Sequence, residues 1–226
     1  MNGKQIVNKY VKQAINALIA GMLIGIGELF YLYCLGAGQA ILGGILFGLS
    51  LLMVLLYGFE YYTAKAGYAV ENKALYLIDC LIAFVGNYAG AWLVALAVKM
   101  TSLTDLANPL MVGLDQLVSS RIGNGLVFDV FGKSLLSGFI LYFVVNTYKK
   151  AEQPIARFAS VFIGALAVFF LGLDELVSSM FAYDLACLSG YAYGDLMSKL
   201  VYVWIGNTLG AMIVPAFRKW KGMLKS

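Results

Sequence analysis

The chain has 226 residues and a net charge of +4; 62% of its residues are hydrophobic and only 12% are charged. Because soluble globular domains carry roughly 25% charged residues, this composition excludes that class of protein. A helix needs about 20 mostly apolar residues to cross a bilayer, and long uncharged runs recur along the chain. They cover residues 37–59, 80–98, 134–148, 158–173 and 200–217. The sequence therefore predicts an all-α polytopic membrane protein embedded in a lipid bilayer.

The sequence carries few of the groups that enzymes use. It contains no histidine, its cysteines do not follow metal-ligand spacing, and it has no Gly-x-Ser-x-Gly nucleophile turn. We therefore predict a protein that is not an enzyme and that holds no metal or cofactor.

Six predicted spans account for the apolar runs. They lie near residues 13–35, 41–69, 75–98, 129–148, 157–187 and 198–217. The basic start of the chain runs into the first span without a convincing cleavage site, so we expect no cleaved signal peptide. Most lysines and arginines fall on the side of both termini, which the positive-inside rule places in the cytoplasm. The basic excess thus follows from topology, and we predict no nucleic-acid partner.

In the first two predicted spans, ionisable residues stand where a plain membrane helix would be apolar. Glu28 lies deep in the first span, within IGIGELFYLY. The second span is apolar through GGILFGLSLLMVLLYGF and then breaks at EYYTAKAGYA, which carries Glu60, Thr63 and Lys65. Ionisable groups inside a membrane mark functional sites by default. Broken backbone at that depth is tolerated only where it is buried in protein or lines a wet cavity.

The fifth span has a matching break at GLDELVSS, where Asp174 and Glu175 stand side by side. We predict that Glu60 and Asp174 cap the second half-helices, since a carboxylate is favoured at a helix N-terminus. Ser178 and Ser179, like the threonine of the second span, either contact a permeant or satisfy backbone groups freed by the break.

Two interpretations of Lys65 are open at this point. The first is that Lys65 supplies positive charge to a transport path. The second is that it forms a buried ion pair with Glu175 or Glu28 that only fixes the loops, because buried charges are generally paired.

A short repeat relates the third and sixth spans. GNYAGAWLV at 86–94 and GNTLGAMIV at 206–214 agree at five of nine positions, and three spans separate them. The two halves would then enter the membrane with opposite orientations, as in inverted-repeat transporters whose site lies at the repeat interface. The alternative is a chance match between small-residue packing motifs. The predicted single domain of 1–226 contains two repeats and an exposed extracellular loop, near residues 13–98, 129–217 and 99–128.

The two breaks resemble those of the formate/nitrite transporter family. FEYYTAKAG is similar to the second-span break of that family, whose pattern Glu60 and Thr63 match. GLDELVSSMF is similar to the fifth-span break, where Asp174 takes the acidic position.

Three further motifs extend the resemblance over essentially the whole chain. The two GN strings, with Asn87 and Asn207, are similar to motifs of the third and sixth spans. GKSLLSGFILYFVV resembles the fourth span, although Gly138 stands where asparagine is usual. The resemblance implies an aquaporin-like protomer with six spans, of which the second and fifth are interrupted. It also implies a homopentamer, with a pore in each protomer, in the inner or plasma membrane of a prokaryote.

One position departs from the family and changes the expected cargo. Members that carry formate, nitrite or related anions have a histidine directly after the fifth-span acid, and here that position holds Glu175. An ionised Glu175 would repel an anion, by on the order of 4 kcal/mol for charges about 4 Å apart at an effective dielectric of about 20. We therefore predict passage of a small monovalent cation or weak base such as ammonium. The other hypothesis is proton-coupled passage of a small monovalent anion or its acid (formate, nitrite, hydrosulfide or a short carboxylate), using Lys65 and Glu175.

Overall fold

The computed structural model describes residues 3–121 and 127–223, which form helices joined by turns and short loops. Four helices are long and apolar enough to cross a membrane, judged by length and composition: α1 (Gly3–Gly36), α4 (Tyr76–Lys99), α6 (Val127–Lys150) and α9 (Tyr193–Met223). Two further segments each consist of two successive helices: α2 (Ala40–Leu56) with α3 (Tyr62–Ala66), and α7 (Pro154–Phe170) with α8 (Leu176–Leu188). This order agrees with six predicted spans, of which the second and fifth are broken.

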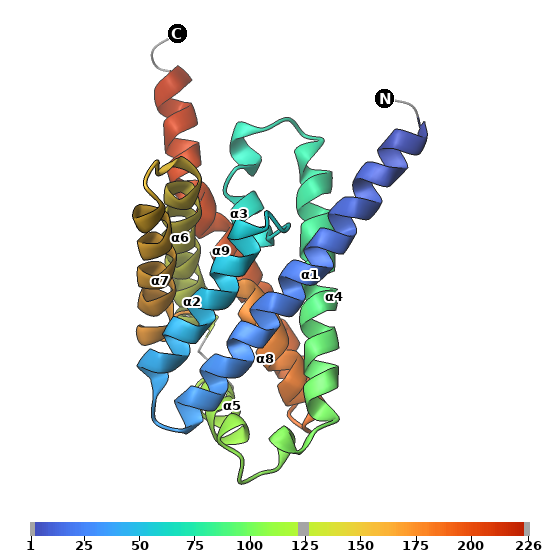
Figure 1. Cartoon of the computed structure of the whole chain (residues 1–226), viewed down its shortest axis with the longest axis vertical. Helices are drawn as coiled ribbons and strands as arrows, with labels where there is room; N and C mark the ends of the chain where they lie inside the picture. Colours follow the sequence, from blue (N-terminus) through green and yellow to red (C-terminus); the bar gives the residue numbers. More distant parts are fainter. Residues whose placement is uncertain (1–2, 122–126, 224–226) are drawn as a thin grey trace.

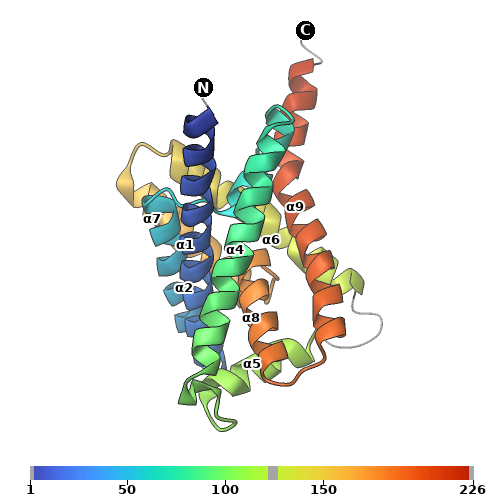
Figure 2. The same ribbon diagram turned by 90° about the vertical axis from the view of Figure 1, so that its right-hand side faces the viewer.

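The helices run between two ends of the molecule. Figure 1 shows α1 beginning and α9 ending at one end, which we call the terminal end. Helix α5 (Pro109–Ser119) lies at the opposite end, here called the α5 end, and Figure 2 shows the same division from the side. Which end faces the cytoplasm stays a prediction from charge.

The two GN strings make equivalent close helix crossings. A Cβ atom added to Gly90 on α4 would collide with the Leu18 carbonyl oxygen on α1, and one added to Gly210 on α9 would collide with the Leu135 carbonyl oxygen on α6. Small residues let helix backbones approach in this way. The α1–α4 and α6–α9 pairs therefore use equivalent glycines at equivalent places. This is consistent with a set of three spans that occurs twice in the chain.

Both broken spans are interrupted by the same turn. Gly58 and Gly172 have positive φ angles of 68° and 60°, which glycine adopts without the strain of a Cβ atom. In each turn the N–H of the next residue bonds to the carbonyl five residues back, at 3.0 Å for Phe59 and 2.9 Å for Leu173. This is the hydrogen-bond pattern of a Schellman motif, and it ends α2 and α7 at corresponding residues.

Aligning the two turns on their glycines puts the breaks in register. Glu60 then corresponds to Asp174, and Tyr61 corresponds to Glu175. Tyr61 and Glu175 are the N-cap residues of α3 and α8. Glu175 is thus not simply a second acid after Asp174, because it holds the capping position of its half-helix.

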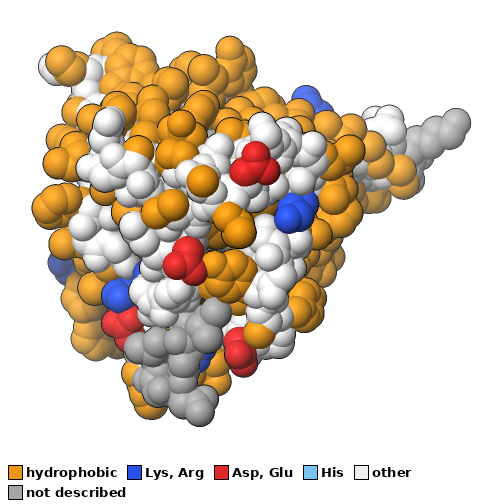
Figure 3. Space-filling view, turned by 90° about the horizontal axis from the view of Figure 1, so that it is seen from below, with side chains coloured by type: hydrophobic (Ala, Val, Ile, Leu, Met, Phe, Trp, Pro, Cys, Tyr) orange, Lys and Arg blue, Asp and Glu red, His pale blue; other side chains and the backbone are white. Residues whose placement is uncertain are grey.

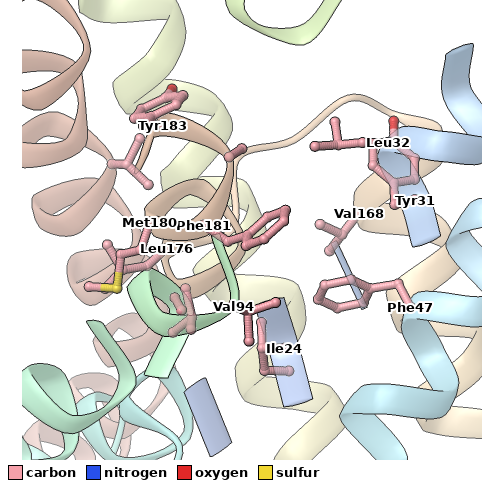
Figure 4. Close-up of a cluster of buried hydrophobic side chains, with 14 of the residues drawn as sticks. Ile24, Tyr31, Leu32, Phe47, Val94, Val168, Leu176, Met180, Phe181 and Tyr183 are labelled. Carbon is pink, nitrogen blue, oxygen red and sulfur yellow. The ribbon is translucent and has the colours of Figure 1, made fainter. Parts of the chain in front are cut away.

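Large apolar side chains fix α8 against its neighbours. Phe181 on α8, Phe47 on α2 and Val168 on α7 point into one space, with Ile24 on α1 beside them (Figure 4). Each of these side chains is at most 1% exposed. Since lipid is as apolar as these side chains, close packing rather than escape from water holds such helices together in a membrane. This packing sets the position of the N-terminus of α8.

The segment predicted as an exposed loop near 99–128 contains a packed helix in its described part. Asn108 caps α5 by accepting from the N–H of Leu110 at 3.0 Å, and Pro109 occupies the first turn, where proline is favoured. Leu110, Leu114 and Val118 are fully buried on one face of the helix. The four-residue spacing of these apolar side chains makes an amphipathic helix, which was not predicted within this connection; its extracellular location stays a prediction.

Candidate transport site

Glu175 lies at the N-terminus of α8 and is 1% exposed. Its Oε2 atom accepts from the Ser178 N–H at 2.8 Å, and the Ser178 hydroxyl donates to the Glu175 carbonyl oxygen at 3.1 Å. The prediction that Asp174 caps this half-helix is therefore wrong, as is the equivalent prediction for Glu60. The glycine turn places each of these acids one residue before the cap.

Thr63 on α3 connects Glu175 to α9. Its Oγ1 atom lies 3.0 Å from the Glu175 Oε1 atom and 3.0 Å from the Asn207 Oδ1 atom. The Asn207 Nδ2 atom lies 3.4 Å from the Ser134 carbonyl oxygen. Because a carbonyl oxygen only accepts, this contact fixes the amide with Oδ1 toward Thr63. The threonine hydroxyl thus has one proton and two acceptors.

A proton on Glu175 completes this hydrogen-bond chain. Glu175 then donates to the Thr63 hydroxyl, which donates to Asn207, and every atom of the chain has a suitable partner. An ionised Glu175 would leave two acceptors facing one hydroxyl proton. It would also leave a buried charge, because no lysine or arginine within the described ranges forms an ion pair with Glu175, and such burial is costly. The arrangement fits a neutral glutamic acid.

The basic residues near the breaks are paired with the acids that precede the caps. Lys65 Nζ lies 2.8 Å from Glu60 Oε2, so neither predicted pairing of Lys65, with Glu175 or with Glu28, occurs. Its own break supplies this carboxylate, five residues earlier in the chain. Arg121 Nε lies 2.8 Å from Asp174 Oδ1, although the sequence placed this arginine only in a polar connection.

A cavity of about 310 Å³ reaches this site from the α5 end. Glu28, Glu175, Ser178 and Ser179 line it, together with Arg121 and Lys133. Seen from this end, charged side chains are scattered over the central surface and hydrophobic side chains surround them (Figure 3). Glu28 is 1% exposed and interacts electrostatically with Glu175. The structure therefore gathers most of the predicted site residues around one buried carboxyl group.

Asn87 has a different environment from Asn207. Its Nδ2 atom donates to the carbonyl oxygens of Ala17 and Glu60, both at 2.8 Å, and its Oδ1 atom accepts from the Tyr62 N–H at 2.8 Å. These bonds join α1, α4 and the first break through backbone groups. Asn87 is thus held in a structural arrangement, and its predicted role along the path stays a prediction.

Tyr61 was not among the predicted site residues. Its side chain is 1% exposed, and its hydroxyl lies beside Glu175 and Thr63, although it makes no well-aligned hydrogen bond to a described residue. Aligning the two breaks on Gly58 and Gly172 identifies Tyr61 as the counterpart of Glu175. That alignment is the sequence signal that could have found it.

The broken spans and the buried polar chain at their meeting point define a polytopic helical membrane protein of the channel or transporter class. The model of the family described as formate/nitrite transporter matches residues 2–221. The chain belongs to the formate/nitrite transporter family, whose members are channels and transporters rather than enzymes. The resemblance drawn from the motifs is thereby confirmed.

Two solved structures share the fold. The first, described as an FNT family ion channel, is 19% identical, with a TM-score of 0.81 over 96% of this chain and 92% of its own. The second, a pentameric formate channel with formate bound, is 15% identical, with a TM-score of 0.77 over 96% of this chain and 98% of its own. No curated protein matches the chain at a significant level.

Proposed function

We propose that this protein carries a small monovalent anion across the membrane together with a proton, or carries the neutral acid of that anion. The candidates are formate, nitrite, hydrosulfide and short carboxylates. The observation that supports this most directly is the arrangement around the Thr63 hydroxyl. Its single proton faces two acceptors if Glu175 is ionised, whereas a protonated Glu175 donates to it. A neutral carboxylic acid does not repel an anion, and it can donate a proton.

The transfer needs one proton for each anion. An anion enters the cavity, and Glu175 Oε1–H donates to an oxygen or sulfur atom of the permeant. The O–H bond of Glu175 breaks, a bond from that proton to the permeant forms, and the neutral acid moves past Thr63 and Asn207. The carboxylate left on Glu175 then takes a new proton. In this proposal Lys65 acts at the terminal end only as the partner of Glu60.

The similar pentameric formate channel supports two parts of the proposal. It binds a small anion, and it is a pentamer. We extend both features to this chain, as a homopentamer in the inner or plasma membrane with both termini in the cytoplasm.

One observation favours the competing hypothesis of a cation or weak base such as ammonium. Glu28 and Glu175 line one cavity, and neither has a basic ion-pair partner among the residues described. If both were ionised, they would attract a monovalent cation. The comparisons do not support this cation preference, and it stays a prediction to be tested against the anion.

Flux into proteoliposomes separates the two hypotheses. The full chain is expected to pass formate and nitrite with accompanying proton entry, and Glu175→Gln to lower that flux by about 100-fold, typical of losing a positioned acid. Gln keeps the shape and the hydrogen bond to Thr63 but cannot give up a proton. Asp105→Asn, at an exposed position of the α4–α5 connection, is the control and is expected to match the unmodified protein. Passage of ammonium without formate or nitrite would refute the proposal.

A further inference from the structure

We infer that Glu28 is a second proton carrier, which exchanges a proton with Glu175 and connects that residue to the cavity at the α5 end. This inference rests on the proposed function, since it supplies the route by which Glu175 regains its proton. It assigns a role in proton transfer to a side chain of α1, outside both broken spans.

The position of Glu28 supports this role. Glu28 and Glu175 are each 1% exposed, line the same cavity and interact electrostatically. The Oε2 atom of Glu28 is buried and has no hydrogen-bond partner in the described ranges. Buried polar atoms nearly always have partners, so an open acceptor beside a second carboxyl group marks a place for a proton or for the water that delivers it.

A second buried group points to the same place. The Tyr61 hydroxyl, from the first break, lies beside the Glu175 carboxyl group and the Thr63 hydroxyl, although it makes no well-aligned hydrogen bond to a described residue. Glu175 therefore has further hydrogen-bonding groups near it from α1 and from the first break. Two such groups around one carboxyl leave room for a water molecule or a permeant to bridge them.

The surrounding charges do not neutralise Glu28. The titratable and charged groups around it are Tyr31 on its own helix, Asp174 and Glu175 at the second break, Tyr183 on α8, Arg121 after α5 and Lys133 on α6. Arg121 is bonded to Asp174 at 2.8 Å, and Lys133 is bonded to Asp129 at 2.7 Å. Two neighbouring carboxyl groups without a basic partner are unfavourable when both are ionised. They titrate as a pair and hold a proton between them.

The proton balance closes over one cycle. After Glu175 has given its proton to the permeant, water in the cavity protonates Glu28, which consumes a proton from the solution at the α5 end. The O–H bond of Glu28 then breaks and an O–H bond forms on Glu175, so that the pair again holds one proton. One proton enters the protein for each anion that leaves as its acid. The Ser178 hydroxyl lies beside both residues: it interacts with the Glu28 side chain and donates to the Glu175 backbone carbonyl oxygen at 3.1 Å.

Infrared spectroscopy of the purified full chain tests the shared proton without any flux. The carbonyl stretch of a protonated carboxyl group is expected to disappear in Glu175→Gln and to shift or weaken in Glu28→Gln. Asp184→Asn is the matched control, because Asp184 is also buried and has an unpartnered Oδ2 atom, but it bonds to Tyr88 and is not among the cavity-lining residues. That variant is expected to leave the Glu175 band in place. The inference would be overturned if the carbonyl band is unchanged in Glu28→Gln, or if no carbonyl band is lost in Glu175→Gln.

Flux then tests the relay. Formate-coupled proton entry is expected to fall about tenfold or more in Glu28→Gln, as for loss of an acid–base group, and to recover partly in Glu28→Asp, which keeps the carboxyl group. Full proton entry in Glu28→Gln would contradict the relay. The unmodified protein could pass neither formate nor nitrite while its carbonyl band still shifts or weakens in Glu28→Gln. In that case the proposed function fails and the shared proton stands. Glu28→Asp also provides the infrared comparison if Glu28→Gln does not fold.

Discussion

At the first break Glu60 pairs with Lys65, and the two side chains are 26% and 17% exposed, whereas at the second break Asp174 and Arg121 pair with side chains only 3% and 6% exposed. The turns before them are the same. The N-cap that follows is a tyrosine at the first break and a glutamic acid at the second. The first break thus has a tyrosine hydroxyl at the N-cap and a partly exposed ion pair. The second break has a carboxyl group at the N-cap and a buried ion pair. Two repeats can therefore share a backbone turn while only one of them carries an ionisable N-cap residue.

The largest difference between the breaks is expected from removing their basic residues. Arg121→Met leaves Asp174 buried without its partner and frees the Gly172 carbonyl oxygen, to which Arg121 donates at 3.0 Å. Breaking a buried pair in this way costs about 3–5 kcal/mol, measured as a loss of thermal stability in detergent. The double variant Arg121→Met/Asp174→Asn is expected to recover part of it, because no buried charge remains. No recovery would show that the charge pair is not the cause.

The two asparagines separate structure from transport. Asn87→Ala removes the side-chain partner of three backbone groups, so we expect a stability loss of about 1–3 kcal/mol for each buried group left unsatisfied, with flux retained in the folded fraction. Asn207→Ala removes the acceptor of Thr63 and is expected to lower flux more than stability. Thermal melts and liposome flux on the same preparations check this, and equal effects of the two variants would remove the distinction.

The shared turn predicts equal effects at both breaks. A Cβ atom at Gly58 or Gly172 would meet nothing within 4 Å, so the cost of Gly58→Ala and of Gly172→Ala comes from the positive φ angle alone, at about 1–2 kcal/mol each. Gly132→Ala on α6 is the control: its Cβ is also unobstructed and its backbone is helical, so it is expected to stabilise slightly. Thermal melts of the three variants compare them, and a large inequality between Gly58 and Gly172 would contradict the common turn.

The smallest effect is expected at the partly exposed pair. Lys65→Met removes a pair of a kind that contributes about 0–1 kcal/mol, so the melting temperature should change little. Formate flux should also change little, because Lys65 bonds to Glu60 rather than to Glu175. A flux loss as large as that of Glu175→Gln would return Lys65 to the transport path and support its predicted role.

The sequence predicts the fold well because its signals are local. Apolar length fixes the spans, and the glycines of the turns and GN strings fix the breaks and helix crossings. The Arg121–Asp174 ion pair could not be predicted, because these residues are far apart in the chain and meet only through the docking of α5. Glu175 was identified by its departure from the family. Its protonation could not be inferred, since this depends on the orientation of Asn207 and on the single proton of Thr63.

The response of formate uptake to membrane potential tests most directly whether a proton travels with the anion. Formate uptake would be measured in liposomes at fixed pH while a potassium diffusion potential of either sign is imposed, with an internal pH dye. If Glu175 gives each formate a proton, uptake is electroneutral: the imposed potential leaves it unchanged, and a proton enters with each formate. Uptake that follows the potential without proton entry would contradict the account.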